Sequence, residues 1–174
     1  MQKPKKPMIV GFQRCGQNSL KQYLLKRYDE VARTEMLHAD NGIRRFKETC
    51  MDEYFPVMIT RHRPFAMWSR YWYFGFNEKM TFAEFLCQND PQISPLYHTD
   101  FGLHITRWQF LDPMIYSMET LLHDPDFHHE NKSKKKEFRQ MTSKEKSLVE
   151  QVIRNYNRQF KIFYDDGDIL TRAQ

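Results

Sequence analysis

A glycine-bounded loop near the start of the chain carries the first chemical pattern of the sequence. Gly11 and Gly16 are five positions apart, the glycine spacing of loops that cradle phosphates with their backbone N–H groups. Gln17 and Asn18 follow, where the Walker A motif has a lysine and then a serine or threonine, so magnesium-dependent triphosphate chemistry is disfavoured. The loop still predicts an anion site, because N–H groups at the start of the next helix attract anions and Arg14 adds positive charge. An ordinary tight turn between a strand and a helix is the alternative.

A basic residue stands at the end of a second apolar run, residues 55–60. A nucleoside-triphosphatase often has a metal-binding aspartate at such a strand end, whereas this chain has Arg61. A guanidinium group matches phosphate oxygens in a fork geometry. Ser69, eight residues later in the helix that Pro64 opens, can present a hydroxyl to the same phosphate. Taken separately, a surface arginine and a helix serine are the simpler interpretations.

The elements that hold these two loops belong to a pattern that extends along the chain, in which apolar runs of strand length alternate with amphipathic helical patterns. The expected strands are residues 8–12, 34–37, 55–60 and 114–118, and the expected helices are residues 19–28, 64–72, 103–111 and 142–163. A further helix is expected after Thr81, which has capping-box spacing to Glu84. The alternation predicts a three-layer, P-loop-like α/β fold with a mainly parallel sheet flanked by helices. We expect one domain of residues 1–174, with residues 1–7 flexible and residues 128–140 forming a polar, basic loop.

Composition limits the class of protein. The chain has 174 residues, 40% of them hydrophobic, and no apolar stretch reaches the roughly 18 residues of a membrane span. Its three cysteines, Cys15, Cys50 and Cys87, are widely spaced and form no CxxC pair, which argues against a disulfide framework and a zinc site. With 27 Lys and Arg against 22 Asp and Glu, the net charge of +5 suggests an anionic ligand. A cytoplasmic protein with no membrane partner is expected.

Together the two loops resemble those of the sulfotransferase superfamily, whose donor is 3′-phosphoadenosine 5′-phosphosulfate (PAPS). Residues 9–20 resemble the family's 5′-phosphosulfate loop, in which Arg14 and Gly16 match the basic residue and the glycine. The Cys, Gln and Asn beside them depart from the family's Lys/Arg-Ser-Gly-Thr-Thr pattern. The donor-binding residues that this resemblance implies are Gln13, Arg14, Cys15, Gly16, Gln17, Asn18 and Ser19.

The most specific match is the segment of residues 60–71, which resembles the family's 3′-phosphate element. It implies that Arg61 and Ser69 clasp the phosphate that distinguishes PAPS from ATP. Residues 116–125 resemble a strand and a Glu-x-Leu segment found late in the fold. Residues 129–136 resemble an Asn-Lys-Ser segment of carbohydrate-type members, which by analogy closes over the donor. The residues implied in that closure are Lys132, Ser133 and Lys134.

The basic segment of residues 132–139 also has an interpretation from charge alone. It holds five cations against one glutamate, so a flexible loop of this kind beside a phosphate site would attract a polyanionic nucleotide. A solvated run of charge is the alternative. A nucleic-acid partner is not expected, because no homeodomain, zinc-finger or RNP-like pattern accompanies the charge.

A histidine is the expected base. An attacking hydroxyl must lose its proton as the bond to sulfur forms, and a neutral imidazole suits that task near pH 7. His38 follows the expected strand of residues 34–37, and open α/β sheets bind ligands at such strand ends. It also precedes Arg61 by 23 residues, which is similar to the spacing in members of the superfamily that use a histidine. Glu35 is the reserve, because other members use a glutamate, and a metal site of His38 and Asp40 lacks a clear third ligand.

The sequence thus predicts a compact PAPS-dependent sulfotransferase, most similar to carbohydrate-type members, that needs no metal. It is expected to move a sulfuryl group to the hydroxyl of a small molecule or glycan and to release adenosine 3′,5′-bisphosphate (PAP), with Arg14 stabilising charge on the leaving phosphate. The residues expected near the acceptor, some of them basic and suited to an acidic sugar, are Asp40, Asn41, Arg44, Arg45 and Lys47. Two alternatives stay open: a family member that binds PAP or an anionic glycan without catalysis, and a P-loop kinase. The oligomeric state stays open as well.

Overall fold

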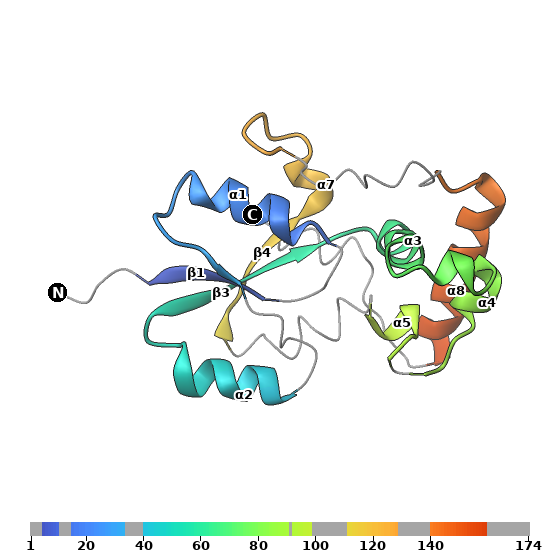
Figure 1. The fold of residues 1–174 in the computed structure, drawn as a ribbon, viewed down its shortest axis with the longest axis horizontal. Helices are drawn as coiled ribbons and strands as arrows, with labels where there is room; N and C mark the ends of the chain where they lie inside the picture. Colours follow the sequence, from blue (N-terminus) through green and yellow to red (C-terminus); the bar gives the residue numbers. More distant parts are fainter. Residues whose placement is uncertain are drawn as a thin grey trace.

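The computed structural model describes residues 5–10, 15–33, 40–90, 92–98, 111–128 and 140–159. Strands and helices alternate as far as α3, and several helices and one last strand follow (Figure 1). The elements are β1 (Lys6–Val10), α1 (Gln17–Leu25), β2 (Ala32–Arg33), α2 (Asp40–Thr49), β3 (Tyr54–Thr60), α3 (Arg63–Tyr73), the 3-10 helix η1 (Phe76–Glu78), α4 (Phe82–Leu86), α5 (Pro95–His98), β4 (Met114–Ser117), α7 (Met118–Leu121) and α8 (Ser143–Gln159).

The four strands form one parallel sheet in the order β2-β1-β3-β4. Strands of a parallel sheet are covered on both faces, and the apolar residues of the two central strands are accordingly buried. These residues are Met8, Ile9 and Val10 of β1 and Val57, Met58 and Ile59 of β3. The register pairs Val10 with Met58, so the carboxyl ends of β1 and β3 lie at the same end of the sheet. The predicted parallel sheet is confirmed.

Helices lie on both faces of the sheet (Figure 1). On one face, Leu20 and Leu24 of α1 and Met118 of α7 pack with Ile9 and Ile59. On the other face, Phe46 of α2 packs with Met8, Val10 and Met58. The predicted three-layer α/β arrangement is therefore confirmed.

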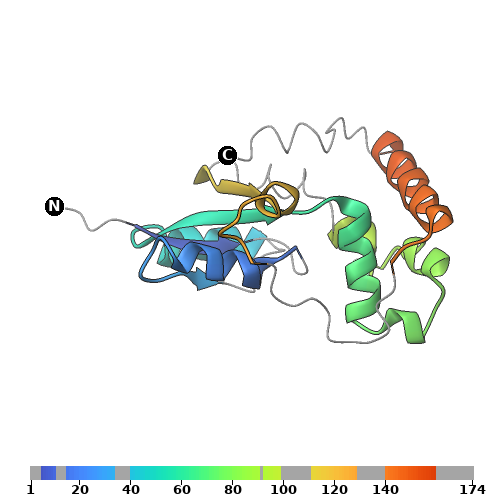
Figure 2. The ribbon, with the colours of Figure 1, turned by 90° about the horizontal axis from the view of Figure 1, so that it is seen from above.

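A second hydrophobic cluster lies beyond the carboxyl end of β3, where α3 meets α4 and α8 (Figures 1 and 2). Trp68 and Phe82 meet edge to face there, with ring centroids 4.7 Å apart. The predicted apolar stripe of the last helix is confirmed for Val149 and Ile153, which are buried in this cluster. α3 contacts both the sheet and the helical cluster. Its Ala66 belongs to the cluster around Ile9 and Ile59 on the sheet (the sheet cluster), whereas Met67 and Trp68 pack with α4 and α8.

The capping box predicted at Thr81 is confirmed. The backbone N–H of Thr81 donates to Glu84 Oε2 at 2.7 Å, and the backbone N–H of Glu84 donates to Thr81 Oγ1 at 3.3 Å. Two donors that the helix itself leaves unpaired at its start are thus satisfied by local side chains.

Several element boundaries differ from those expected. β1 begins at Lys6, so Lys6 and Pro7 pair with β3 instead of belonging to the leading segment. β4 ends at Ser117, because the Ser117 Oγ accepts the Thr120 N–H at 3.4 Å and Met118 opens a short helix.

Other predicted elements fall partly or wholly outside the described residues. These are the strand at 34–37, most of the helix at 103–111, the end of the last helix beyond 159, and the basic loop from 129 to 139.

Candidate functional site

The turn from β1 into α1 depends on Gly16. This residue is the N-cap of α1 and has φ 99° and ψ 23°, a left-handed conformation that glycine adopts without steric cost. It is also crowded, because a Cβ at this position would lie 2.9 Å from Met118 Sδ and 3.5 Å from Ile59 Cδ1. The glycine that the sequence pattern singled out is therefore required by both backbone conformation and space.

The first turn of α1 presents backbone donors at the carboxyl edge of the sheet. Helix geometry leaves the N–H groups of the first turn without partners inside the helix, and they attract anions. The Leu20 N–H, at the end of that turn, already donates to the Gly16 carbonyl at 2.9 Å. Backbone N–H groups at the start of a helix are able to bind an anion, which is the role that the sequence predicts for this turn.

The side chains of this turn differ in exposure. Those of Cys15, Gln17 and Ser19 are buried, whereas that of Asn18 is exposed. The guanidinium of Arg33, at the end of β2, donates to Asn18 Oδ1. Asn18 thus binds a residue of the neighbouring strand, which the sequence pattern gave no means to foresee.

Arg61 directly follows the last residue of β3, at the same carboxyl end of the sheet as the turn before α1. Burial lowers the pKa of the Arg61 guanidinium, while electrostatic attraction to Cys15 and to Glu119 acts in the opposite direction. Arg61 therefore interacts electrostatically with the turn before α1 and with α7. The parallel register of β1 and β3 puts Arg61, directly after β3, and the turn after β1 at the same end of the sheet, and the phosphate-binding roles of both stay predictions.

α3 follows Arg61 and carries Ser69. The helix begins at Arg63 with Pro64 in its first turn, and His62 is its N-cap. Ser69 is buried on α3. The structure thus places Ser69 on the helix that starts two residues after Arg61.

Glu119 lies in the Glu-x-Leu segment, but the sequence assigned it no role at the candidate site. Its Oε1 accepts the backbone N–H of His62 at 2.7 Å, and its Oε2 accepts the Ser117 hydroxyl at 3.1 Å. The Thr60 hydroxyl also donates a hydrogen bond of 3.3 Å to the Tyr116 carbonyl. The ends of β3 and β4 are therefore fastened to each other at the edge where Arg61 lies. The Glu-x-Leu segment was a signal for Glu119, although it carried no role.

Several predicted site residues lie outside the described residues, so their roles stay predictions. They are Gln13, Arg14, Glu35, His38, Lys132, Ser133 and Lys134. Of the residues predicted near the acceptor, Arg44 and Lys47 are exposed on α2, and Arg44 lies 3.9 Å from Glu48.

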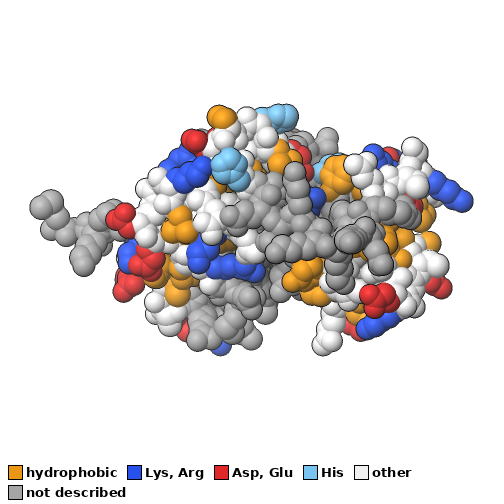
Figure 3. All heavy atoms as spheres, turned by 45° about the horizontal axis from the view of Figure 1, so that its top comes forward, with side chains coloured by type: hydrophobic (Ala, Val, Ile, Leu, Met, Phe, Trp, Pro, Cys, Tyr) orange, Lys and Arg blue, Asp and Glu red, His pale blue; other side chains and the backbone are white. Residues whose placement is uncertain are grey.

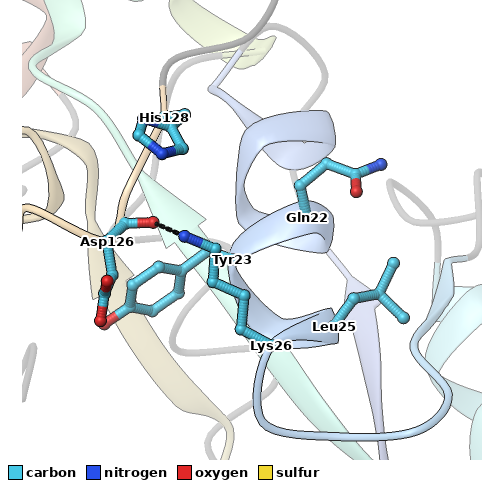
Figure 4. A pocket seen from close by; sticks show the side chains of 6 residues that line it. All are labelled: Gln22, Tyr23, Leu25, Lys26, Asp126 and His128. Carbon is cyan, nitrogen blue, oxygen red and sulfur yellow. Dashed lines mark hydrogen bonds between the residues drawn. The ribbon is translucent and has the colours of Figure 1, made fainter.

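A separate hollow of about 320 Å³ lies over the second half of α1 (Figure 4). The Lys26 ammonium donates to the Asp126 carbonyl at 2.6 Å across it. Its lining residues are Gln22, Tyr23, Leu25, Lys26, Asp126 and His128. The face of the molecule in Figure 3 intermixes basic, acidic, histidine and hydrophobic side chains. This hollow is distinct from the first turn of α1, which holds the candidate anion site.

Two properties of the described segments bear on cofactors and membranes. Within them, no group of three or more His, Cys, Asp or Glu residues is placed to hold a metal ion. The helices among residues 5–10, 15–33, 40–90, 92–98, 111–128 and 140–159 include none with the length and apolar character to cross a membrane.

Comparison with known proteins gives a likeness in structure. No family model matches the chain, and no curated protein matches it in sequence. Its fold is similar to that of a sulfotransferase from Alicyclobacillus acidocaldarius, with a TM-score of 0.55 and 12% sequence identity. The similarity covers 95% of this chain and 98% of the other. At this identity the likeness shows a shared sulfotransferase-like fold.

Proposed function

We propose that the chain is a sulfotransferase that moves a sulfuryl group from PAPS to a hydroxyl acceptor. The observation that carries the proposal is the position of Arg61. This basic residue follows β3 at the end of the sheet where the chain turns from β1 into α1. Two elements to which we assign phosphate binding thus lie at the same end of the sheet, in a fold similar to that of a solved sulfotransferase. PAPS carries phosphate at both its 5′ and 3′ positions, so it needs two such elements.

The glycine loop holds the 5′-phosphosulfate in this proposal. The left-handed Gly16 directs the chain into α1, and the N–H groups of the first turn bind the phosphate oxygens. Arg14 adds the positive charge that the missing Walker lysine does not supply. Residues 13–19 bind mainly through their backbone, because the side chains of Gln17 and Ser19 are buried.

Arg61 and Ser69 hold the 3′-phosphate. Burial weakens the hydration of the Arg61 guanidinium, and a phosphate that replaces this lost water gains a strong charge-assisted contact. Ser69 adds a hydroxyl from α3, the helix that begins two residues after Arg61. Lys132, Ser133 and Lys134 close over the bound nucleotide from the basic loop.

The transfer is in line. His38 belongs to the segment between β2 and α2, and takes the proton of the acceptor hydroxyl as its oxygen bonds to sulfur. The bond from sulfur to the 5′-phosphate oxygen breaks in the same step, and Arg14 stabilises the charge left on PAP. Glu35 is the alternative base in the same segment. The reaction needs fixed positive charge and positioning, and no step requires a metal ion.

The acceptor is a hydroxyl compound, and a carbohydrate is the class that the Asn-Lys-Ser resemblance favours. Arg44 and Lys47 are exposed on α2, the helix that follows the segment of His38. Their charge suits a sugar that carries carboxylate or sulfate groups.

A second candidate is a protein that binds PAP or an anionic glycan without transfer. Asn18 favours it, because its side chain accepts a bond from Arg33 where active family members have a threonine. A P-loop kinase has less support, since Gln17 and Asn18 replace the residues that hold triphosphate and magnesium.

Calorimetric titration with PAP tests the donor site, with ADP and with ATP plus magnesium as comparisons. Tighter binding of PAP than of either comparison supports the sulfotransferase site, whereas a preference for ATP with magnesium supports a kinase. Incubation with labelled PAPS and candidate hydroxyl acceptors then separates the two remaining functions. Label in an acceptor supports transfer, while PAP binding without any transfer supports the non-catalytic protein.

A further inference from the structure

The geometry points to Glu119 as the positioning residue that sets the direction of Arg61 toward the 3′-phosphate, acting through the backbone of His62. The inference rests on the proposed function and deepens it, because it assigns the selectivity for a 3′-phosphate in part to a carboxylate from another element. Glu119 acts through Arg61 and is not assigned a contact with the donor.

Both oxygens of the Glu119 carboxylate have partners. Oε1 accepts the His62 N–H at 2.7 Å, and Oε2 accepts the hydroxyl of Ser117 at 3.1 Å. Ser117 is itself fixed, since it is buried and its Oγ accepts the Thr120 N–H at 3.4 Å. A carboxylate held at both oxygens has one orientation, so the acceptor offered to His62 has a fixed place.

The bond to His62 controls the peptide group that follows Arg61. The His62 N–H and the Arg61 carbonyl belong to one planar unit, so holding the N–H also fixes the plane at the Arg61 Cα. His62 is the N-cap of α3, with φ −50° and ψ 122°, and its N–H comes before the helical hydrogen bonds begin. Glu119 supplies the acceptor that neither β3 nor α3 provides for this group.

Charge adds to the effect of the hydrogen bond. Burial lowers the pKa of Arg61, and electrostatic attraction to Glu119 opposes that change. The carboxylate therefore stabilises the charged guanidinium in a partly buried position before any phosphate arrives. A cation kept charged and aimed in advance loses little free energy of reorganisation on binding.

The selectivity for a 3′-phosphate measures this role directly. The readout is the ratio of the dissociation constants of AMP and PAP, which differ only in the 3′-phosphate. We expect Glu119→Ala to lower this ratio about tenfold or more, through weaker PAP binding. Glu119→Gln keeps a carbonyl oxygen for the His62 N–H, so we expect it to retain most of the ratio, within about threefold of the wild type.

Glu84→Ala is the matched control. Glu84 also accepts a backbone N–H next to a helix start, from Thr81 at 2.7 Å, but it lies on α4, away from the sheet edge. We expect this variant to lose thermal stability and keep the AMP-to-PAP ratio. If Glu119→Ala does not fold, Glu119→Asp makes the same test, because its shorter side chain cannot span His62 and Ser117 together.

The outcomes separate this role from the proposed function. A wild-type chain that binds AMP as tightly as PAP overturns the proposed function, and this role with it. A selective wild type whose ratio is unchanged in Glu119→Ala, or in Glu119→Asp if that variant is the one that folds, overturns the role of Glu119 alone. Equal weakening of AMP and PAP in the folded variant also overturns it, because that result shows a general effect on the fold.

Discussion

The Tyr23 hydroxyl donates a hydrogen bond of 2.6 Å to Asp124 Oδ2, and this bond joins α1 to the chain that follows α7. The two residues are 101 positions apart in the sequence. The Tyr23 ring is buried against Phe127, with ring centroids 5.7 Å apart, and the Arg27 guanidinium lies 4.1 Å above it. The second half of α1 is therefore held by a contact with a segment distant in the sequence, whereas the predicted anion site lies at the start of the helix.

This bond predicts how stability depends on pH. The bond from Tyr23 is the main cause that lowers the pKa of Asp124 below its ordinary 3.8, and the Asp126 N–H adds to it. A carboxyl group with a lowered pKa in the folded state contributes stability above pH 3.8 that is lost as the pH falls through the folded value. We expect Tyr23→Phe to melt a few degrees lower at neutral pH and to lose less stability between about pH 4 and pH 2 than the wild type. Thermal melts over this range check it, with Asp124→Asn expected to behave alike; parallel curves for wild type and Tyr23→Phe would contradict it.

The conformation and crowding of Gly16 predict that adding a single methyl group there lowers the free energy of unfolding strongly. In Gly16→Ala, the left-handed backbone and the contact with Met118 Sδ act together, so we expect a loss of about 2–3 kcal/mol in the free energy of unfolding. Gly75 is the matched control, because its φ is +70° while the nearest atom to an added Cβ, Glu78 Oε2, is 3.9 Å away. Gly75→Ala should cost roughly 1 kcal/mol from backbone strain alone. Urea denaturation compares the two, and an equal cost would show that the contact with Met118 carries no weight.

Arg61 predicts selective loss of the 3′-phosphate contact. We expect Arg61→Ala to weaken PAP binding at least tenfold, and AMP binding by less than about threefold, because AMP lacks the group that Arg61 holds. Arg158→Ala, which removes an exposed cation from α8, controls for the change in net charge. Titration calorimetry measures all three proteins, and equal losses for PAP and AMP would refute the role given to Arg61.

The role of general base proposed for His38 predicts that its substitution slows sulfuryl transfer without weakening donor binding. We expect His38→Asn to lower the rate of sulfuryl transfer by roughly 10²- to 10⁴-fold, the usual contribution of a general base, while the PAP dissociation constant stays near that of the wild type. Glu35→Gln should keep most of the rate. The reverse pattern, with a slow Glu35→Gln and an active His38→Asn, would assign the base to Glu35 instead.

Arg70 predicts that a buried charge costs stability. Burial alone lowers the pKa of this α3 residue to about 10, and among the described residues its Nε has no hydrogen-bond partner, while NH2 donates to the Gln92 carbonyl at 3.2 Å. At neutral pH the guanidinium is charged, so the cost of burying that charge is fully present. Arg70→Met keeps most of the side-chain volume. We expect its free energy of unfolding to equal or exceed that of the wild type, with a loss of no more than about 1 kcal/mol. Arg70→Ala should be less stable because it leaves a cavity, and a clear loss in Arg70→Met would contradict the prediction.

Local patterns in the sequence were enough for the elements that hold the site. The alternation of apolar runs and helical patterns predicted β1, α1, β3 and α3. The capping box at Thr81 was predicted because all of its contacts lie within four residues. Gly16 was identified from its five-residue spacing to Gly11, and Arg61 because it directly follows the apolar run of residues 55–60, where open α/β sheets bind ligands.

Contacts between distant segments were beyond the reach of these patterns. Glu119 meets His62 across 57 positions, and this meeting depends on β4 lying next to β3, which no local spacing encodes. The end of β4 at Ser117 was also missed, because Met118 is apolar and suits a strand or a buried helix equally well. The bond from Arg33 to Asn18 likewise depends on β2 lying beside β1.

The two faces of α3 have a consequence for how the chain loses its structure. Ala66 packs with the sheet cluster, whereas Met67 and Trp68 pack with α4 and α8, so the two hydrophobic clusters meet along a single helix. Cooperative melting of the whole chain therefore passes through α3, and a weakened α3 would let the two clusters melt at separate temperatures. In the proposed function a nucleotide binds between the start of α1 and α3. It should raise the melting temperature of the wild type and, in a variant with a weakened α3, bring the two thermal transitions closer together.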